Sequence, residues 1–216
     1  MDKPVILFGA GPLSIAALNI FNDNEIIVYG ILDDDTKLHG SEIMEATVLS
    51  STEDDSYLKI LGKKSEAFVA LEDVLLRKRI VKVLNEERDV MPVNAIHSNC
   101  HIAKFAEIGH GNLIDSGTVI GAKAKLGNHC ILHSNSTIEP DVSIGDYTQI
   151  GPGSVISSGV SIGNDVFIGA GAVIVSGVSI AQNARIGAGS VVVSNVKKDE
   201  TVFGNPAKSI DVDNRS

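Results

Sequence analysis

The sequence predicts two domains of different class: an α/β, Rossmann-like domain at the N-terminus, followed by an all-β solenoid. Two observations lead to this prediction. Seventeen aliphatic residues recur every six positions, without a slip, from Ile96 to Val192. Before them, residues 1–90 alternate short apolar segments with amphipathic ones. The chain has 216 residues, which is enough for two small domains.

The N-terminal segment, residues 1–90, predicts strands and helices in alternation. The expected order is a strand, a helix, a second strand, a later third strand and a second helix, at residues 5–8, 13–21, 26–29, 67–71 and about 75–84. In the last helix, the apolar residues Leu76, Ile80, Val83 and Leu84 share one face. This order is that of a truncated doubly wound unit.

A glycine turn joins the first strand to the first helix, and its residues are Gly9, Ala10, Gly11 and Pro12. Glycines before a helix N-terminus allow a tight turn and the close approach of a phosphate. Ser14 stands where the dinucleotide-binding fingerprint has its third glycine. Asp33 and Asp34 end the second strand, where such folds hold a sugar hydroxyl. A tight turn without a ligand, followed by a solvated acidic turn, fits the same residues.

The period of six predicts short strands separated by tight corners. Neither the helical period of 3.6 nor the strand period of 2 produces it, whereas a solenoid needs one large side chain per segment on a shared axis. A small or β-branched residue follows four positions after most aliphatic residues, and we expect it to face inward at the corner. Examples are Ala106, Thr118, Cys130, Ser136, Val142, Thr148, Val166 and Ala184.

The repeat resembles that of the hexapeptide acyltransferases. The resemblance implies a left-handed parallel β-helix over residues 91–200, with three hexapeptides in each coil and between five and six coils. The segment VFGNPAKSI, Val202–Ile210, is similar to the closing segment of the acetyl-CoA-dependent members, which lies near the cofactor. Residues 201–216 are therefore expected to form a C-terminal tail near acetyl-CoA.

The order of the two domains resembles the sugar O-acyltransferases related to sialic-acid O-acetyltransferase and to bacterial nucleotide-aminosugar N-acetyltransferases. The resemblance implies acetyl transfer from acetyl-CoA, as cosubstrate, to an amino or hydroxyl group of a nucleotide-linked sugar. It also implies that the acceptor binds to the N-terminal domain, at the positions that match Gly9, Ala10, Gly11, Pro12, Asp33 and Asp34. Leu71 and Glu72 stand where the family often has Gly-Asn or Gly-Asp. The basic residues of the helix that follows, Arg77, Lys78, Arg79 and Lys82, read as a solvated face.

The family's general base is usually a histidine followed by an acidic residue, and here Pro140 and Asp141 match this pair. A second family histidine, which contacts the cofactor, corresponds to Gln149. Of the six histidines, His133 lies in the same coil region and is the candidate base, while Asp141 is the candidate to orient the substrate amine. The other five, which read as surface or corner histidines, are His39, His97, His101, His110 and His129.

The resemblance also implies a homotrimer with active sites between neighbouring β-helices. Matched by position, Gln149, Ala170 and Ala188 would line the pantetheine arm of acetyl-CoA. Gly169 and Gly187 would permit close approach of the backbone to this arm.

Composition and charge exclude several classes of partner and site. A net charge of −9 argues against a nucleic-acid partner. We find no signal peptide at the start and no apolar run long enough to span a membrane, so we expect a cytoplasmic protein. Cys100 and Cys130 read as small core residues in a reducing compartment, and no spacing suggests a metal site.

Three functions therefore stay open. The first is acetylation of a nucleotide-linked sugar for the biosynthesis of a surface polysaccharide. The second is O-acetylation of a free sugar such as sialic acid. The third is a non-catalytic trimeric scaffold, because both recognisable family histidines are replaced, by Pro140 and Gln149. The sequence leaves the sugar, the nucleotide and the choice between N- and O-acetylation open.

Overall fold

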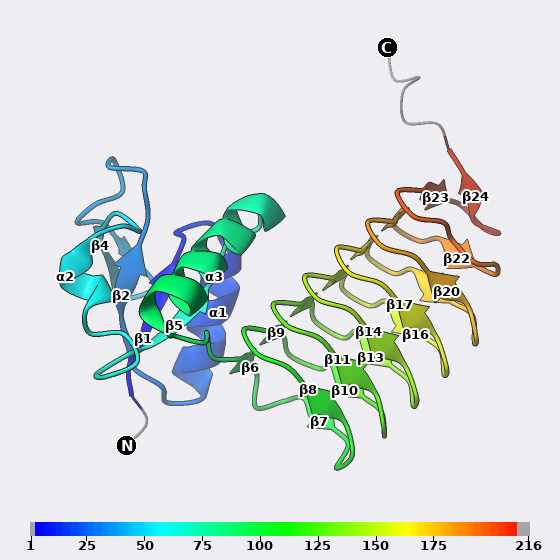
Figure 1. Cartoon of the computed structure of the whole chain (residues 1–216). Helices are drawn as coiled ribbons and strands as arrows, with labels where there is room; N and C mark the ends of the chain where they lie inside the picture. Colours follow the sequence, from blue (N-terminus) through cyan, green and yellow to red (C-terminus); the bar gives the residue numbers. More distant parts are fainter. Residues whose placement is uncertain (1–2, 211–216) are drawn as a thin grey trace. The chain divides into compact units, whose positions relative to one another are not determined.

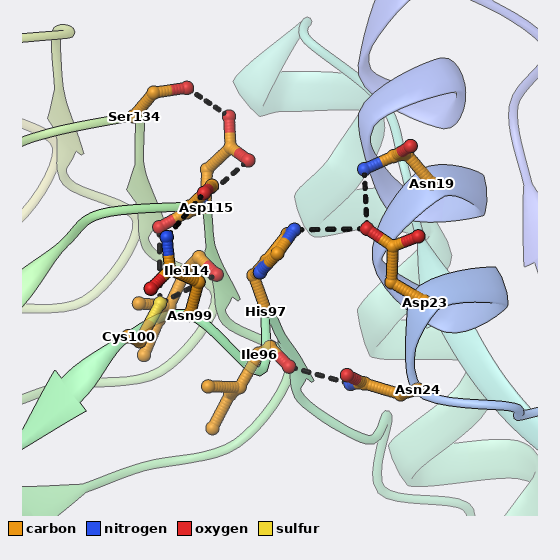
Figure 2. Close-up of polar contacts among 11 residues, drawn as sticks. Asn19, Asp23, Asn24, Ile96, His97, Asn99, Cys100, Ile114, Asp115 and Ser134 are labelled. Atoms are coloured by element: carbon orange, nitrogen blue, oxygen red, sulfur yellow. Dashed lines mark hydrogen bonds and ion pairs between the residues drawn. The ribbon is translucent and has the colours of Figure 1, made fainter.

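The computed structural model describes residues 3–210, and the chain divides into two compact units, Met1–Ser98 and Asn99–Ser216. The division lies after Ser98, later than the change in composition near residue 90. Side-chain contacts explain the difference, as Figure 2 shows: Nδ2 of Asn24 donates to the carbonyl oxygen of Ile96 over 2.7 Å, and Nε2 of His97 lies 3.0 Å from Oδ2 of Asp23. Strand β6 (Ala95–Ile96) and the two residues after it, His97 and Ser98, thus belong to the first unit.

The first unit has a five-stranded sheet in the order β3-β4-β2-β1-β5 (Figure 1). Its strands are β1 (Val5–Phe8), β2 (Val28–Leu32), β3 (Glu42–Ile43), β4 (Ala46–Ser50) and β5 (Glu66–Val69), and the unit also contains β6 (Ala95–Ile96). All pairs are parallel except β3–β4. Every residue of β1 is buried, as expected for a central parallel strand covered on both faces.

Three helices belong to this unit: α1 (Pro12–Asp23), α2 (Asp55–Leu58) and α3 (Val74–Arg88). Helix α1 begins with Pro12, whose fixed φ suits the first helical position. Its Phe21 packs edge-on against Phe68 of β5, with ring centroids 5.7 Å apart. Helix α3 is capped by Asp73, whose carboxylate accepts from the amides of Leu75 and Leu76. No helix within residues 3–210 is long and apolar enough to cross a membrane.

Strand β2 begins at Val28 rather than at residue 26, because the preceding residues finish helix α1. The amide of Ile26 donates to the carbonyl oxygen of Phe21, and Glu25 has a left-handed φ of 57°. The β3–β4 hairpin and helix α2 were not predicted from the sequence.

The prediction for helix α3 was wrong at two positions. Arg77, expected on a solvated face, is only 2% exposed, and its Nη1 donates to the carbonyl oxygen of Leu71 over 2.6 Å. Leu76, expected in the core, is 37% exposed, and Val81 is buried instead. The guanidinium thus binds the loop between β5 and α3.

The second unit is a coil with three faces, each a sheet whose strands pair in parallel except for β23 with β24 (Figure 1). The β10 face contains β7 (His101–Ile102), β10 (Val119–Ile120), β13 (Thr137–Ile138), β16 (Val155–Ile156), β19 (Val173–Ile174) and β22 (Val191–Val192). The β11 face contains β8 (Glu107–Ile108), β11 (Lys125–Leu126), β14 (Ser143–Ile144), β17 (Ser161–Ile162) and β20 (Ser179–Ile180). The β12 face contains β9 (Leu113–Ile114), β12 (Ile131–Leu132), β15 (Gln149–Ile150), β18 (Phe167–Ile168), β21 (Arg185–Ile186), β23 (Thr201–Phe203) and β24 (Lys208–Ser209).

Three columns of corners join these faces. We call residues 115–118, 133–136, 151–154, 169–172 and 187–190, between the β12 and β10 faces, the histidine corner. The lysine corner, between the β10 and β11 faces, comprises residues 103–106, 121–124, 139–142, 157–160 and 175–178. The asparagine corner, between the β11 and β12 faces, comprises residues 109–112, 127–130, 145–148, 163–166 and 181–184.

Each coil contains three hexapeptides, so strands pair with the strand 18 residues onward, as Ile138 does with Ile156, until β21, whose Arg185 pairs with Thr201. The repeated aliphatic residues fill the interior, and Ile150 and Ile168 are fully buried. The small corner residues also face inward as predicted. Their hydroxyls reach carbonyl oxygens of the next coil: Oγ of Ser154 donates to Gly169 over 3.0 Å.

A ladder of side chains closes the asparagine corner. The side-chain oxygens of Asn128, Asp146 and Asn164 accept the backbone amides of His110, Asn128 and Asp146, over 2.9, 2.7 and 2.9 Å. Each acceptor lies one coil above its donor. These side chains satisfy amides that the tight corner leaves outside the sheets.

Candidate functional site

The histidine corner brings together two residues that the sequence marked as candidates. His133 follows β12, and Gln149 begins β15 in the next coil, where it pairs with Ile131. Nε2 of Gln149 lies 2.8 Å from Nε2 of His133, and both residues are half-buried. With the amide of Gln149 in this orientation, its nitrogen donates and Nε2 of His133 accepts.

This contact can serve both protonation states of the imidazole. In the observed arrangement, the Nε2 lone pair of His133 is engaged, so the ring takes up a proton only when the amide of Gln149 turns or moves aside. A turned amide would present its oxygen, which accepts a hydrogen bond from protonated Nε2. A histidine held in this way is suited to exchange a proton with a substrate.

A carboxylate occupies the same corner one coil below. Asp115 stands 18 residues before His133, and both of its carboxylate oxygens are engaged (Figure 2). Oδ2 accepts from Oγ of Ser134 over 2.6 Å, and Oδ1 accepts from the amide of Ser116 over 2.7 Å. Asp115 therefore fixes the loop that carries His133. No motif in the sequence marks Asp115, although its spacing of 18 residues from His133 places it at the same corner.

Two of the proposed cofactor residues, Ala170 and Ala188, lie two and three coils above His133 at the same corner. Ala170 and Ala188 are exposed, and each occupies the second position of its turn. Gly169 and Gly187 precede them, but the protein itself accounts for these glycines. A Cβ at Gly169 would lie 2.5 Å from the amide nitrogen of Ala188, and one at Gly187 would lie 2.1 Å from the ring of Phe203.

Asp141 and Pro140 lie at the lysine corner, at the other end of β13 from His133. Both are exposed, and Asp141 has a left-handed φ of 59°. The carbonyl oxygen of Pro140 accepts from the amide of Gly159 over 3.2 Å. Within one chain, the structure therefore places the two candidate catalytic residues at different corners of the same coil.

The glycine turn of the first unit is held by Asp33. Oδ2 of Asp33 accepts from the amide of Ala10 over 2.7 Å, and Oγ of Ser14 donates to the carbonyl oxygen of Gly9. Gly9 has φ 104°, and a Cβ there would lie 2.9 Å from the carbonyl oxygen of Ala70, so the fold itself requires glycine. Gly11 is exposed, with nothing within 4 Å of a Cβ built on it, and Pro12 follows as the first residue of α1.

The acidic pair lies beside a cleft at the carboxyl ends of the strands. Oδ1 of Asp34 accepts from both the amide and the hydroxyl of Thr52, each over 2.9 Å. Asp33, Asp34, Thr52, Leu71, Leu76 and Ile80 line a cavity of about 70 Å³. A second cavity of about 450 Å³ shares Thr52 and Ile80 with it and extends to Arg79 and Arg88. Ligands of doubly wound sheets bind at this edge. Thr52 follows the unpredicted strand β4, so no sequence signal indicated it.

Three of the other histidines have structural contacts. His129 is 4% exposed, and its ring stacks on that of Tyr147 with centroids 5.0 Å apart. His97 pairs with Asp23, and Nε2 of His39 donates to the carbonyl oxygen of Asp33 over 2.8 Å. His101 and His110 are exposed.

Comparisons with known proteins agree with this architecture. Residues 123–158 and 159–194 match the family model described as bacterial transferase hexapeptide (six repeats). No curated protein matches the sequence. Among solved structures, the chain is similar to a substituted form of perosamine N-acetyltransferase from Caulobacter crescentus in complex with CoA and GDP-perosamine. The identity is 27%, 98% of each chain is covered, and the TM-score is 0.86.

Two further structures share the fold. The acetyltransferase domain of PglB from Neisseria gonorrhoeae, in complex with acetyl coenzyme A, is 24% identical over 97% of this chain and all of that chain, with a TM-score of 0.88. WeeI from Acinetobacter baumannii is also 24% identical over 97% of this chain and all of that chain, with a TM-score of 0.85. The chain is therefore an α/β unit followed by a left-handed parallel β-helix, of which residues 123–158 and 159–194 match the hexapeptide transferase repeat.

Proposed function

We propose that this protein transfers an acetyl group from acetyl-CoA to an amino or hydroxyl group of a nucleotide-linked sugar. The observation that carries the proposal is the match, over 98% of both chains, to an N-acetyltransferase crystallised with CoA and GDP-perosamine. The histidine corner supports it with a half-buried imidazole that is hydrogen-bonded to Gln149, beneath the exposed Ala170 and Ala188.

In this proposal, acetyl-CoA lies along the histidine corner, with its pantetheine arm passing Ala188, Ala170 and Gln149. Gly169 and Gly187 keep the corner narrow. The acceptor nitrogen or oxygen attacks the thioester carbon, and His133 takes the proton that the nucleophile loses. The carbon–sulfur bond then breaks, and the proton passes to the sulfur of CoA as it leaves. A positioned base of this kind contributes typically 10²–10⁴-fold to the rate, an order-of-magnitude figure.

In the proposal, the first unit binds the substrate that accepts the acetyl group. We assign the acceptor to the edge that carries Gly9–Pro12, Asp33 and Asp34. The amide of Ala10 is taken by Asp33, and Pro12 has no N–H, so this edge offers few donors for a phosphate. Its carboxylates instead suit groups that donate, such as ribose hydroxyls or base N–H groups.

We also propose a homotrimer, which the outer surface of the β-helix supports. The β10 face carries a column of outward valines that includes Val155, Val173 and Val191, and Val193 at its edge is 53% exposed. The β11 face instead presents Lys125, Ser143, Ser161 and Ser179. An apolar flat face is typical of an interface, and threefold symmetry closes a heterologous contact.

The trimer would also complete the site. The histidine and lysine corners are the two edges of the β10 face, so packing three β10 faces around an axis brings the histidine corner of one copy beside the lysine corner of the next. Asp141 of one copy then stands near His133 of its neighbour, where it can orient the acceptor amine.

A direct assay tests this function. The purified protein is incubated with acetyl-CoA and a panel of UDP- and GDP-linked aminosugars, and products are identified by mass spectrometry while free CoA thiol is measured. We expect one acetylated nucleotide sugar with an equal amount of CoA. Acetylation of free sialic acid alone would favour the O-acetyltransferase. Bound acetyl-CoA without transfer to any acceptor would favour the non-catalytic scaffold, which the proline at position 140 suggests.

A further inference from the structure

One column of side chains runs up the outside of the β12 face, beside the histidine corner. Because the strands pair in register, the column contains, coil by coil, Leu113, Ile131, Gln149, Phe167 and Arg185. Its first two members are buried, the next two are half-buried, and Arg185 is exposed. The column therefore opens to solvent in the coils where the proposed function places acetyl-CoA.

Arg185 differs in charge from the other outward residues of the upper coils. In the strands from β14 to β22 the first residue points outward, and these residues are Ser143, Gln149, Val155, Ser161, Phe167, Val173, Ser179, Arg185 and Val191. Arg185 is the one charged residue among them, in a chain whose net charge is −9. A cation that stands in such neutral surroundings is suited to attract an anionic ligand.

The guanidinium of Arg185 lies over an aromatic ring. Its carbon Cζ is 4.9 Å from the ring centroid of Phe167, in the coil below. A guanidinium that packs on a ring uses its flat face, so the N–H groups along its edge stay available. These N–H groups match two oxygens of a phosphate. Phe167 therefore orients the guanidinium without taking its hydrogen-bond donors.

No carboxylate of residues 3–210 forms an ion pair with Arg185. Glu200 is adjacent, because its carbonyl oxygen accepts from the amide of Arg185 over 2.9 Å. Its carboxylate, however, accepts from the amide of Lys197 over 2.7 Å. Covering the ring of Phe167 requires a flat or apolar side chain, but it does not require a set of available donors. The fold thus does not explain the charge at this position.

The level of Arg185 along the β-helix matches the length of a pantetheine arm. Arg185 stands three coils above Ile131, in the strand that leads to His133, which is about 14 Å at about 4.8 Å per coil. The arm has about as many chain atoms between its sulfur and its first phosphate as four extended residues, which span about 14 Å. A thioester held at His133 therefore brings the diphosphate of CoA to the level of Arg185.

We propose that Arg185, held over Phe167, binds the diphosphate of acetyl-CoA and makes the protein selective for this donor over shorter thioesters. The inference rests on the proposed function, because it extends the acetyl-CoA path to the coil of Ala188, which follows Arg185 by three residues. Phe167 is a positioning residue, since it acts on the ligand through the guanidinium. The recognised chemistry is a phosphate, and CoA carries it both in its diphosphate and as its 3′-phosphate.

Calorimetric titration of the full-length protein with CoA tests this subsite. Arg185→Gln removes a charge at an exposed position, and we expect a loss of about tenfold or more in CoA affinity with an unchanged melting temperature. The matched control is Lys198→Gln, which removes the same charge from an exposed residue near the asparagine corner, where the next amide, that of Asp199, donates to Gln182. The control should bind CoA as the wild type does.

A double-mutant cycle tests the positioning role of Phe167. Phe167→Leu keeps an apolar side chain but removes the ring on which the guanidinium rests. It should weaken CoA binding when Arg185 is present and should have no effect in the Arg185→Gln background. An equal loss in both backgrounds would show that Phe167 acts independently of Arg185, and it would overturn the positioning role.

Dephospho-CoA separates the two phosphates, because it lacks the 3′-phosphate and keeps the diphosphate. Arg185→Gln should weaken CoA and dephospho-CoA by the same factor, whereas a loss for CoA alone would overturn the diphosphate assignment. CoA affinity that is unchanged in folded Arg185→Gln, or equally reduced in Lys198→Gln, would overturn the subsite and leave the proposed acetyl transfer standing. A wild type that does not bind CoA would contradict the proposed function itself.

Discussion

Nε2 of Gln149 donates a hydrogen bond to Nε2 of His133 over 2.8 Å, and this bond joins two adjacent coils of the β-helix. Nε2 of His133, which a general base must offer to the substrate proton, is thus engaged by Gln149. If the amide of Gln149 turns, its oxygen can accept a hydrogen bond from the protonated ring of His133. This relationship makes His133 the residue on which acetyl transfer depends in our proposal, and Gln149 a residue that positions it.

His133→Ala should lower kcat for acetyl transfer by about 10²–10⁴-fold, because the substrate proton then has no acceptor at the corner. CoA affinity should stay unchanged, because the pantetheine arm contacts other residues. His110→Ala, at an exposed histidine of the asparagine corner, is the matched control. Full turnover by His133→Ala would remove this histidine from the mechanism.

Pro140→His should restore turnover to the His133→Ala variant. The new imidazole would stand beside Asp141 at the lysine corner, which the proposed trimer places next to the histidine corner. The fold should tolerate the change, since Pro140 is exposed and the carbonyl oxygen that accepts from Gly159 is retained. We expect at least about a tenfold recovery in rate, well inside the range for a general base. No recovery in a correctly folded double variant would argue against corners that meet across the trimer.

Ala188→Trp should abolish acetyl-CoA binding while the oligomer persists. Ala188 is exposed on the proposed path of the pantetheine arm, and an indole there fills the narrow corner. Gln182→Trp, at the same turn position of the asparagine corner, should bind acetyl-CoA normally. Calorimetry and light scattering report the two properties separately. Normal binding by Ala188→Trp would place the cofactor on another part of the protein.

Light scattering at micromolar concentration should give three times the chain mass of 22.7 kDa. Val173→Lys should shift the mass toward the monomer, because it buries a charge within the proposed interface on the β10 face. Ser161→Lys introduces a lysine at an outward position of the β11 face, outside the proposed interface, and should leave the trimer intact. A monomeric wild type would contradict both the interface and the shared site.

The stability of the first unit should depend on pH through Asp54, which caps helix α2. The hydroxyl of Ser50, followed by the backbone amide of Ser56, donates to its carboxylate and holds the pKa of Asp54 below its ordinary value. A carboxyl group with a lowered pKa stabilises the folded state above the unfolded pKa, and this contribution is lost as pH falls through the folded pKa. In urea unfolding, the deficit of Asp54→Asn should be largest near neutral pH and should shrink below about pH 4. A deficit that does not change with pH would rule out the charge as its cause.

The β-helix could be predicted from the sequence alone. A strict period of six forces one aliphatic side chain per segment inward and fixes the spacing of the corners, and the resemblance to the hexapeptide acyltransferases adds three hexapeptides per coil, hence the three faces. The same spacing could have located the column of Gln149, Phe167 and Arg185. It could also have shown that His133 and Asp141, eight residues apart, occupy different corners.

Only the tertiary structure decided the features that depend on contacts between distant segments. The β3–β4 hairpin and helix α2 are too short for any periodicity to show. Arg77 is buried because the loop at Leu71 needs a donor, and Gly187 is a glycine because Phe203 covers it. The hydrogen bond between His133 and Gln149 joins two coils. A local sequence pattern predicts whether a side chain faces inward or outward. Its hydrogen-bond or packing partner comes from another part of the chain, and that partner determines what the side chain can do chemically.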